Sequence, residues 1–140
     1  MQWNYRVKRL LKAGEYNRNG YIVDKESLNK HLDTLIKYGV LHILEPFEND
    51  EEKEFKNLVT VPLEKIIGNV CGYDDDYFYL NDIVNPKYED CLDGFSCEMA
   101  LLINPKNDYT NEDGILVRKV HRVLQLRLIK NIGGKQNEWI

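Results

Sequence analysis

The sequence between positions 21 and 44 reads YIVDKESLNKHLDTLIKYGVLHIL, and this stretch decides the expected fold. Apolar residues recur at helical spacing in its centre: Leu28, Leu32, Leu35 and Ile36. Asp24 stands where an N-cap residue belongs, and Gly39 is a typical helix stop. The apolar pieces 21–23 and 40–44 on either side are typical of strands. The stretch therefore predicts an amphipathic helix inserted between two strands.

Outside this stretch the pattern is mostly β-like. Further strands are expected over residues 5–11, 58–61, 65–73, 77–81, 95–103, 115–120 and 123–129. The acidic run 74–76 is expected to turn a hairpin, and Asn85 followed by Pro86 is expected to open a short helix over residues 87–92. The sequence predicts an α+β fold in a single domain, residues 1–140. It would be a mainly antiparallel, barrel-like sheet of about seven strands, with one amphipathic helix in the N-terminal third and a short helix before the strand of Ser96.

Composition excludes several classes of protein. The chain has 140 residues and a formal net charge of −4, which argues against non-specific nucleic-acid binding by its whole surface. Its early basic residues, Arg6, Lys8, Arg9 and Lys12, are interpreted as a solvated strand face. No apolar run approaches the roughly 20 residues that span a bilayer, so no membrane partner is expected.

The three cysteines, Cys71, Cys91 and Cys97, indicate neither a disulfide framework nor a zinc site. Their odd number fits a reducing compartment, and their spacing lacks the C-x-x-C pattern of a zinc knuckle. Alternation along the expected strand turns Cys97 toward the core. We expect no metal and no cofactor.

Three polar residues in apolar strands form the candidate site: His42, Ser96 and His121. A serine hydroxyl becomes a nucleophile when an imidazole takes its proton, and a third group must hold that imidazole. Ser96 follows Gly94 at the start of a strand, which is expected to expose its hydroxyl. The alternative for each is ordinary: a solvent-facing strand serine and two polar-face histidines.

Five motifs resemble, in order, segments of the tailed-bacteriophage prohead (capsid maturation) serine proteases. They are NRNGYIVDKESL at 17–28, GVLH at 39–42, IIGNV at 66–70, LDGFS at 92–96 and VLQLRLI at 123–129. That family is similar in fold to the herpesvirus assemblins, which carry a Ser-His-His triad on a seven-stranded barrel. The resemblance implies Ser96 as nucleophile, His42 as base and His121 as third member. The sequence departs from the phage pattern at Gln125, where many relatives carry an acidic residue.

The resemblance implies a serine endopeptidase that cleaves scaffold and capsid precursor proteins during head assembly. It would act in the host cytoplasm, in the assembling prohead or virion, and a homodimer is expected by analogy with the assemblins. One alternative is a catalytically inactive domain of the same fold that serves as a virion structural or partner-binding protein. Another is a small cytosolic regulator unrelated to the family.

Overall fold

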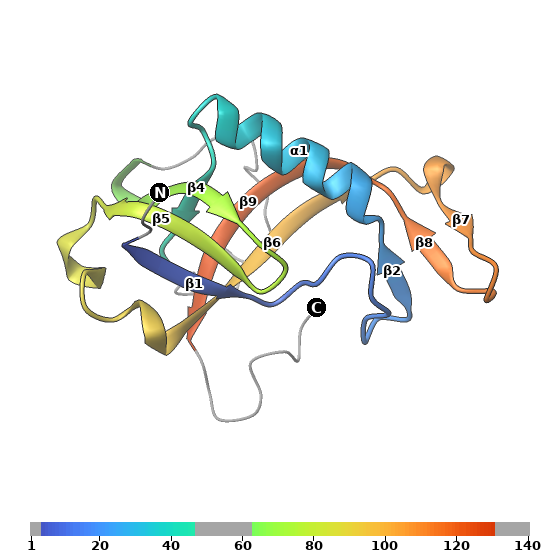
Figure 1. The fold of residues 1–140 in the computed structure, drawn as a ribbon, viewed down its shortest axis with the longest axis horizontal. Coiled ribbons are helices and arrows are strands. Elements are labelled where there is room, and N and C mark those ends of the chain that lie inside the picture. Colours follow the sequence, from blue (N-terminus) through green and yellow to red (C-terminus); the bar gives the residue numbers. More distant parts are fainter. Residues whose placement is uncertain (1–3, 47–62, 131–140) are drawn as a thin grey trace.

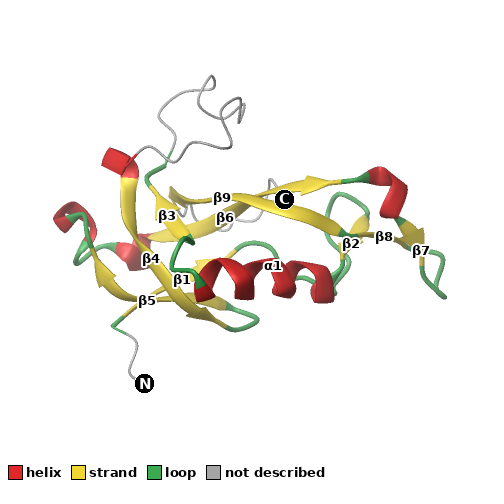
Figure 2. Ribbon diagram, turned by 90° about the horizontal axis from the view of Figure 1, so that it is seen from above, coloured by secondary structure: helices red, strands yellow, loops and turns green. Residues whose placement is uncertain are grey.

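Within residues 4–46 and 63–130, which the computed structural model describes, the chain forms one α-helix and nine strands. The helix is α1 (Lys25–Lys37), and the strands are β1 (Tyr5–Arg9), β2 (Tyr21–Val23), β3 (His42–Leu44), β4 (Ile66–Tyr73), β5 (Tyr77–Ile83), β6 (Phe95–Ile103), β7 (Tyr109–Thr110), β8 (Leu116–Arg118) and β9 (Val120–Lys130). Figures 1 and 2 show β1, β4 and β5 toward one end of the molecule and β7 and β8 toward the other. The fold is α+β, as predicted.

The main sheet is a closed six-stranded barrel in the order β1-β5-β4-β3-β9-β6. Two of its pairings are parallel: β1 with β6 and β3 with β9. The remaining three strands form a separate sheet in the order β2-β8-β7. The expected barrel is therefore confirmed, but the prediction of one mainly antiparallel sheet of about seven strands is wrong in strand number and in strand pairing. Closing a barrel joins strands that are distant in the sequence, and a period-two pattern carries no information on which strands meet.

Helix α1 confirms the prediction made from residues 21–44. The Asp24 side chain accepts a hydrogen bond of 2.9 Å from the backbone N–H of Ser27, which caps the first turn. Leu28 and Leu32 are fully buried against the barrel, where α1 packs on β9 and β4 (Figure 1). Burying a leucine side chain contributes about 1.5–3 kcal/mol. Gly39 has a φ of +68°, the left-handed conformation that ends a helix.

The predicted hairpin over residues 74–76 is confirmed between β4 and β5. The Asp74 carboxylate accepts hydrogen bonds of 2.8 Å from the backbone N–H groups of Asp76 and Tyr77, and the Tyr79 hydroxyl also donates to it. Gly68 of β4 lies so close to β5 that there is no room for a side chain at this position. A Cβ there would lie 2.6 Å from Leu80 Cδ2 and 2.8 Å from the backbone oxygen of Asp82.

The short helix expected over residues 87–92 is not continuous. Two 3₁₀ turns, Pro86–Tyr88 and Leu92–Gly94, take its place, although Asn85 caps the first of them as expected. The segment is too short for the cooperative hydrogen bonding of an α-helix. Side-chain packing holds the segment in place instead. Tyr88 is buried, and its ring meets that of Phe95 edge to face, with 5.7 Å between the ring centres.

Several strand boundaries differ from the expected ones. Strand β6 has the predicted bounds. The strand expected over residues 115–120 is divided between β8 and the start of β9, which runs on from Val120 to Lys130 and includes the strand expected over 123–129. Strand β7 was not predicted. The strand expected over residues 58–61 lies outside the described residues.

The early basic residues do not form one solvated face. Arg9 is 3% exposed, and its guanidinium lies 5.0 Å from the ring centre of Phe78, whereas Lys12 forms an exposed ion pair with Asp76. Burial lowers the pKa of Arg9, because desolvation disfavours its charge. The prediction of a solvated face is therefore wrong for Arg9.

Candidate functional site

His42 begins strand β3 and lies opposite Asn69 of β4. The Asn69 side-chain oxygen contacts His42 Nδ1, and because an amide oxygen can only accept, this contact suits a ring that carries a proton on Nδ1. Ile43, the next residue, is fully buried in the barrel, and alternation turns His42 to the outer face. His42 is thus half-buried, and its ring contacts the Asn69 amide, whereas the sequence had predicted His121 as the group that orients it.

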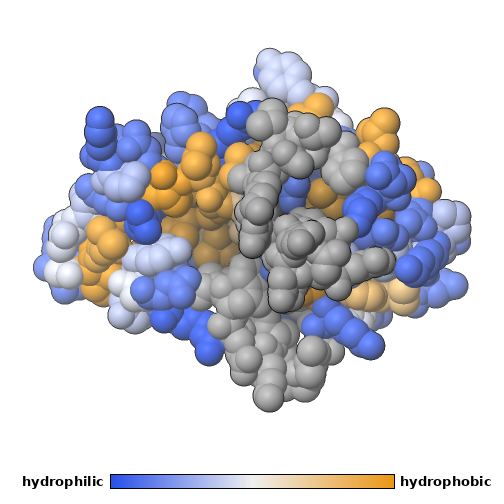
Figure 3. Space-filling model, turned by 180° about the vertical axis from the view of Figure 1, so that it is seen from behind, coloured by the Kyte–Doolittle hydropathy of each residue, from blue (hydrophilic) through white to orange (hydrophobic). Residues whose placement is uncertain are grey.

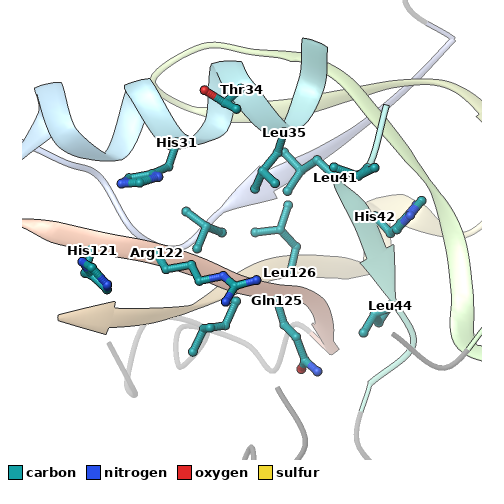
Figure 4. Close-up of a pocket in the computed structure, with 13 residues that line it drawn as sticks. His31, Thr34, Leu35, Leu41, His42, Leu44, His121, Arg122, Gln125 and Leu126 are labelled. Atoms are coloured by element: carbon teal, nitrogen blue, oxygen red, sulfur yellow. The ribbon is translucent and has the colours of Figure 1, made fainter. Parts of the chain in front are cut away.

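A groove of about 400 Å³ lies between α1, the start of β3 and strand β9 (Figure 4). It is lined by His31, Thr34, Leu35, Val40, Leu41, His42, Leu44, His121, Arg122, Val123, Leu124, Gln125 and Leu126. All three histidines of the chain contribute to it. In Figure 4, His31 and His121 lie toward one end of this groove and His42 toward the other. The groove brings His42 and His121 into one site without placing them side by side.

His121 owes its position to an irregularity in the β6–β9 ladder. Val120 pairs with Ile103 and Arg122 pairs with Leu102, so His121 has no partner on β6 and forms a bulge. Both His121 and Arg122 are exposed, which regular alternation would not allow. The bulge therefore presents a histidine and an arginine together at one end of the groove.

Ser96 lies elsewhere. It is fully buried on β6, between Ile129 of β9 and Lys8 of β1, and it does not line the groove. The expectation of an exposed hydroxyl at the start of this strand is wrong. Phe95 begins β6 as predicted, and the serine that follows it pairs with β9 on one side and with β1 on the other.

The strand register gives the separation of Ser96 from His42. Ile43 pairs with Leu126, and extending this register by one residue places His42 beside Gln125, which pairs with Ala100. Ser96 is four residues from Ala100 along β6 and two strands from His42. With spacings of about 3.3 Å per residue and about 4.8 Å per strand, the two α-carbons are about 16 Å apart. This distance is too long for proton transfer between their side chains.

Neither the neighbour of His42 on β9 nor the residue beyond it on β6 carries a nucleophile. Ala100 has no reactive group, and Gln125 has a neutral amide in place of an acid or base. The Oε1 atom of Gln125 is buried and has no hydrogen-bond partner in the described part of the chain. An unsatisfied buried acceptor is costly, and a ligand N–H group in the groove would satisfy it.

Between the rows of Gln125 and Ser96 lies a buried ion pair. Glu98 and Arg127 face each other across β6 and β9, are 6% and 4% exposed, and pair through Arg127 Nε and a Glu98 carboxylate oxygen. Burial lowers the pKa of Arg127, because desolvation disfavours the guanidinium charge. In the sequence this ion pair is visible only as two opposite charges in two separate apolar segments. The sequence does not show that these two strands pair.

The described residues offer no cluster for a metal ion: no three His, Cys, Asp or Glu side chains among them could hold one. Cys97 is buried in the core as predicted, and burial raises the pKa of its thiol to about 12, which leaves it protonated and inert. No helix in residues 4–46 and 63–130 has both the length and the apolar character needed to cross a lipid bilayer.

Sequence reasoning missed two residues of the groove, His31 and Arg122. His31 lies one helical turn before Leu35, at the margin of the apolar face of α1. This spacing is the one feature of the sequence that could have placed His31 beside the groove. No known protein family matches the chain, and no curated protein or solved structure is significantly similar to it. The resemblance to the prohead proteases, and the catalytic roles it implies, stay predictions.

Proposed function

We propose that this chain is a catalytically inactive, partner-binding domain with a barrel of the prohead-protease kind, and that its partners are proteins of the phage head. One observation carries the proposal: His42 has Asn69 and Gln125 as its strand neighbours, with Ala100 next in the row beyond Gln125, while Ser96 is fully buried about 16 Å away. A base without a nucleophile within reach cannot open an acyl-transfer reaction.

Binding is the activity that such a site retains. The groove between α1 and β9 combines apolar side chains with histidines and Arg122, the mixture of features that typically recognises a peptide or another protein. The face of the molecule opposite to that of Figure 1 also carries apolar side chains gathered around a hollow (Figure 3). The five ordered motifs support the choice of phage head proteins as partners.

The test is covalent labelling with a serine-directed phosphonate. We expect no adduct on the folded chain under conditions that fully label a known serine protease. Ser96→Ala should behave as the unchanged chain does in this assay and in association with scaffold and capsid precursor. An adduct at Ser96 that disappears in Ser96→Ala, together with cleavage of the precursor, would refute the proposal and restore the endopeptidase.

A matched gain-of-function variant sharpens this test. Ala100→Ser places a hydroxyl on β6 in the row of Gln125 and His42, which brings a nucleophile nearer to the histidine than Ser96 is. Phosphonate labelling of Ala100→Ser, with none of the unchanged chain, would support the view that a base persists where the nucleophile is missing. Labelling of the unchanged chain at Ser96 would contradict it.

A further inference from the structure

Strand β9 has an edge that no other strand covers in the described part of the chain. Strand β6 pairs with β9 from Val120 to Lys130, but on the other side β3 pairs only at Leu126 and Arg127. The N-terminal half of β9 therefore lacks a neighbouring strand on the β3 side within residues 4–46 and 63–130. One of its end groups is occupied, since Val120 N–H donates to Ser27 Oγ at 2.9 Å.

The groove runs along this uncovered edge. Six consecutive residues of β9, from His121 to Leu126, line it. Successive side chains of a strand point to opposite faces, so a cavity touched by six residues in a row follows the edge of the strand and not one face. In an antiparallel ladder the backbone groups that do not bond to the partner point outward along alternate residues. Those of β9 are directed at the groove.

From this geometry we infer that the groove binds an extended, acidic segment of a partner protein, which adds to β9 as a further strand. The inference rests on the proposed function and names the partner's chemistry. Main-chain hydrogen bonds to a strand edge supply affinity in this mode of recognition, and pockets for alternate side chains supply specificity.

The charge of Arg122 favours an acidic occupant. Arg122 and three histidines line the groove, and none of its lining residues within 4–46 and 63–130 is Asp or Glu. Arg122 is exposed, and a guanidinium binds a carboxylate in a two-pronged geometry that a neutral peptide cannot offer. Leu35, Leu41 and Leu126 provide apolar contacts, so the segment would place aliphatic residues beside its carboxylates. The buried Oε1 of Gln125 would accept one of its N–H groups.

The test begins with selection of displayed random ten-residue peptides on the full chain. Selected peptides should be enriched in Asp or Glu and in Val, Ile or Leu. Their affinities are then measured by fluorescence anisotropy. Arg122→Glu should weaken binding at least tenfold, while Lys106→Glu, a matched reversal at an exposed lysine outside the groove, should leave it within twofold. Failure to enrich acidic peptides, or equal effects of the two variants, would overturn the inference.

Backbone pairing is tested without altering the protein. Two versions of a selected peptide are N-methylated, one at odd positions and one at even positions. A strand added to β9 uses the N–H groups of alternate residues, so one version should lose binding at least tenfold and the other should retain it. Equal loss or equal retention would overturn strand addition. Self-association of the chain that peptide cannot displace would assign the edge to a second copy, which also overturns it.

The outcomes separate this inference from the proposed function. Phosphonate labelling at Ser96 would refute the inactive domain, whatever the peptide affinities are. If neither Arg122→Glu nor peptide N-methylation has the expected effect on binding, and Ser96 is not labelled by the phosphonate, the strand-addition site is refuted. The proposal of an inactive domain is then unaffected.

Discussion

The buried pair of Glu98 and Arg127 gives the largest stability effect that the structure predicts. Glu98→Gln keeps the size of the side chain but removes the carboxylate that faces a 4% exposed guanidinium. Breaking a buried ion pair from one side costs about 3–5 kcal/mol, because the remaining charge is left desolvated without its counterion. Domains of this size have about 5–15 kcal/mol of stability. A fall of about 10 °C in Tm is therefore expected.

Removing both charges should cost far less. Replacement of a buried ion pair by apolar residues of similar volume is neutral or stabilises by about 1–4 kcal/mol. Glu98→Leu combined with Arg127→Leu should therefore be at least as stable as the unchanged chain. The coupling energy in the double-mutant cycle should reach about 3 kcal/mol or more.

Urea unfolding followed by far-UV circular dichroism measures both effects, with the slope of free energy against urea held constant as the check on two-state behaviour. Glu112→Gln, at an exposed glutamate, is the matched control and should change the free energy of unfolding by less than about 0.5 kcal/mol. A cost below about 1 kcal/mol for Glu98→Gln, or a double variant less stable than either single one, would refute the reasoning.

Three further predictions follow from the barrel and its hairpin. Gly68→Ala should destabilise by about 1–3 kcal/mol, because its methyl group would overlap the neighbouring strand, while Gly94→Ala, with open space around it, should be nearly neutral in the same urea assay. Asp74→Asn should destabilise at pH 7. The Tyr79 hydroxyl and the N–H groups of the turn lower the pKa of Asp74. The stabilisation by this carboxylate is therefore present above the unfolded-state pKa and is lost as the pH falls through the folded-state pKa. If Asp74→Asn destabilises the chain as much at pH 2 as at pH 7, this explanation is wrong. Iodoacetamide should modify exposed Cys91 and spare Cys97 in the folded chain, which mass spectrometry of the digested protein would check.

Local signals were sufficient for the parts of the fold that are built from neighbours in the sequence. The Asp24 cap, the leucine spacing and Gly39 fix α1, because each acts within one or two helical turns. The acidic turn at 74–76 fixes the β4–β5 hairpin for the same reason. Strand β6 has the predicted bounds because Gly94 and a continuous apolar run define its start and its length.

The barrel itself could not be predicted in this way. Its parallel pairs join β1 to β6 and β3 to β9, strands separated by most of the chain. Whether a strand joins the barrel or the small sheet depends on tertiary packing, which leaves no mark on local periodicity. This is why β2 and β8, which have ordinary strand patterns, were assigned to the main sheet.

The candidate site was only half predictable for the same reason. His42 and His121 were correctly identified as strand histidines, and the structure brings both to one groove. Ser96 was judged from the glycine before it, whereas the structure places it fully buried in the interior of the sheet, with Ile129 and Lys8 as its ladder partners. Exposure of a strand residue depends on what covers the sheet, and the sequence of the strand does not contain that information.

The departures from regular strand structure concentrate on the β6–β9 pair. Leu124 and His121 are each left without a partner on β6, and these two bulges break the alternation that the sequence alone would predict. Bulges re-aim side chains and bend the strand that contains them, and they are over-represented next to functional sites. Here they lie in the half of β9 that lines the groove, and the one at His121 leaves Arg122 exposed beside it. Since natural chains give up local regularity where function requires it, the irregular half of β9 is a stronger indication of function than the regular, enclosed position of Ser96.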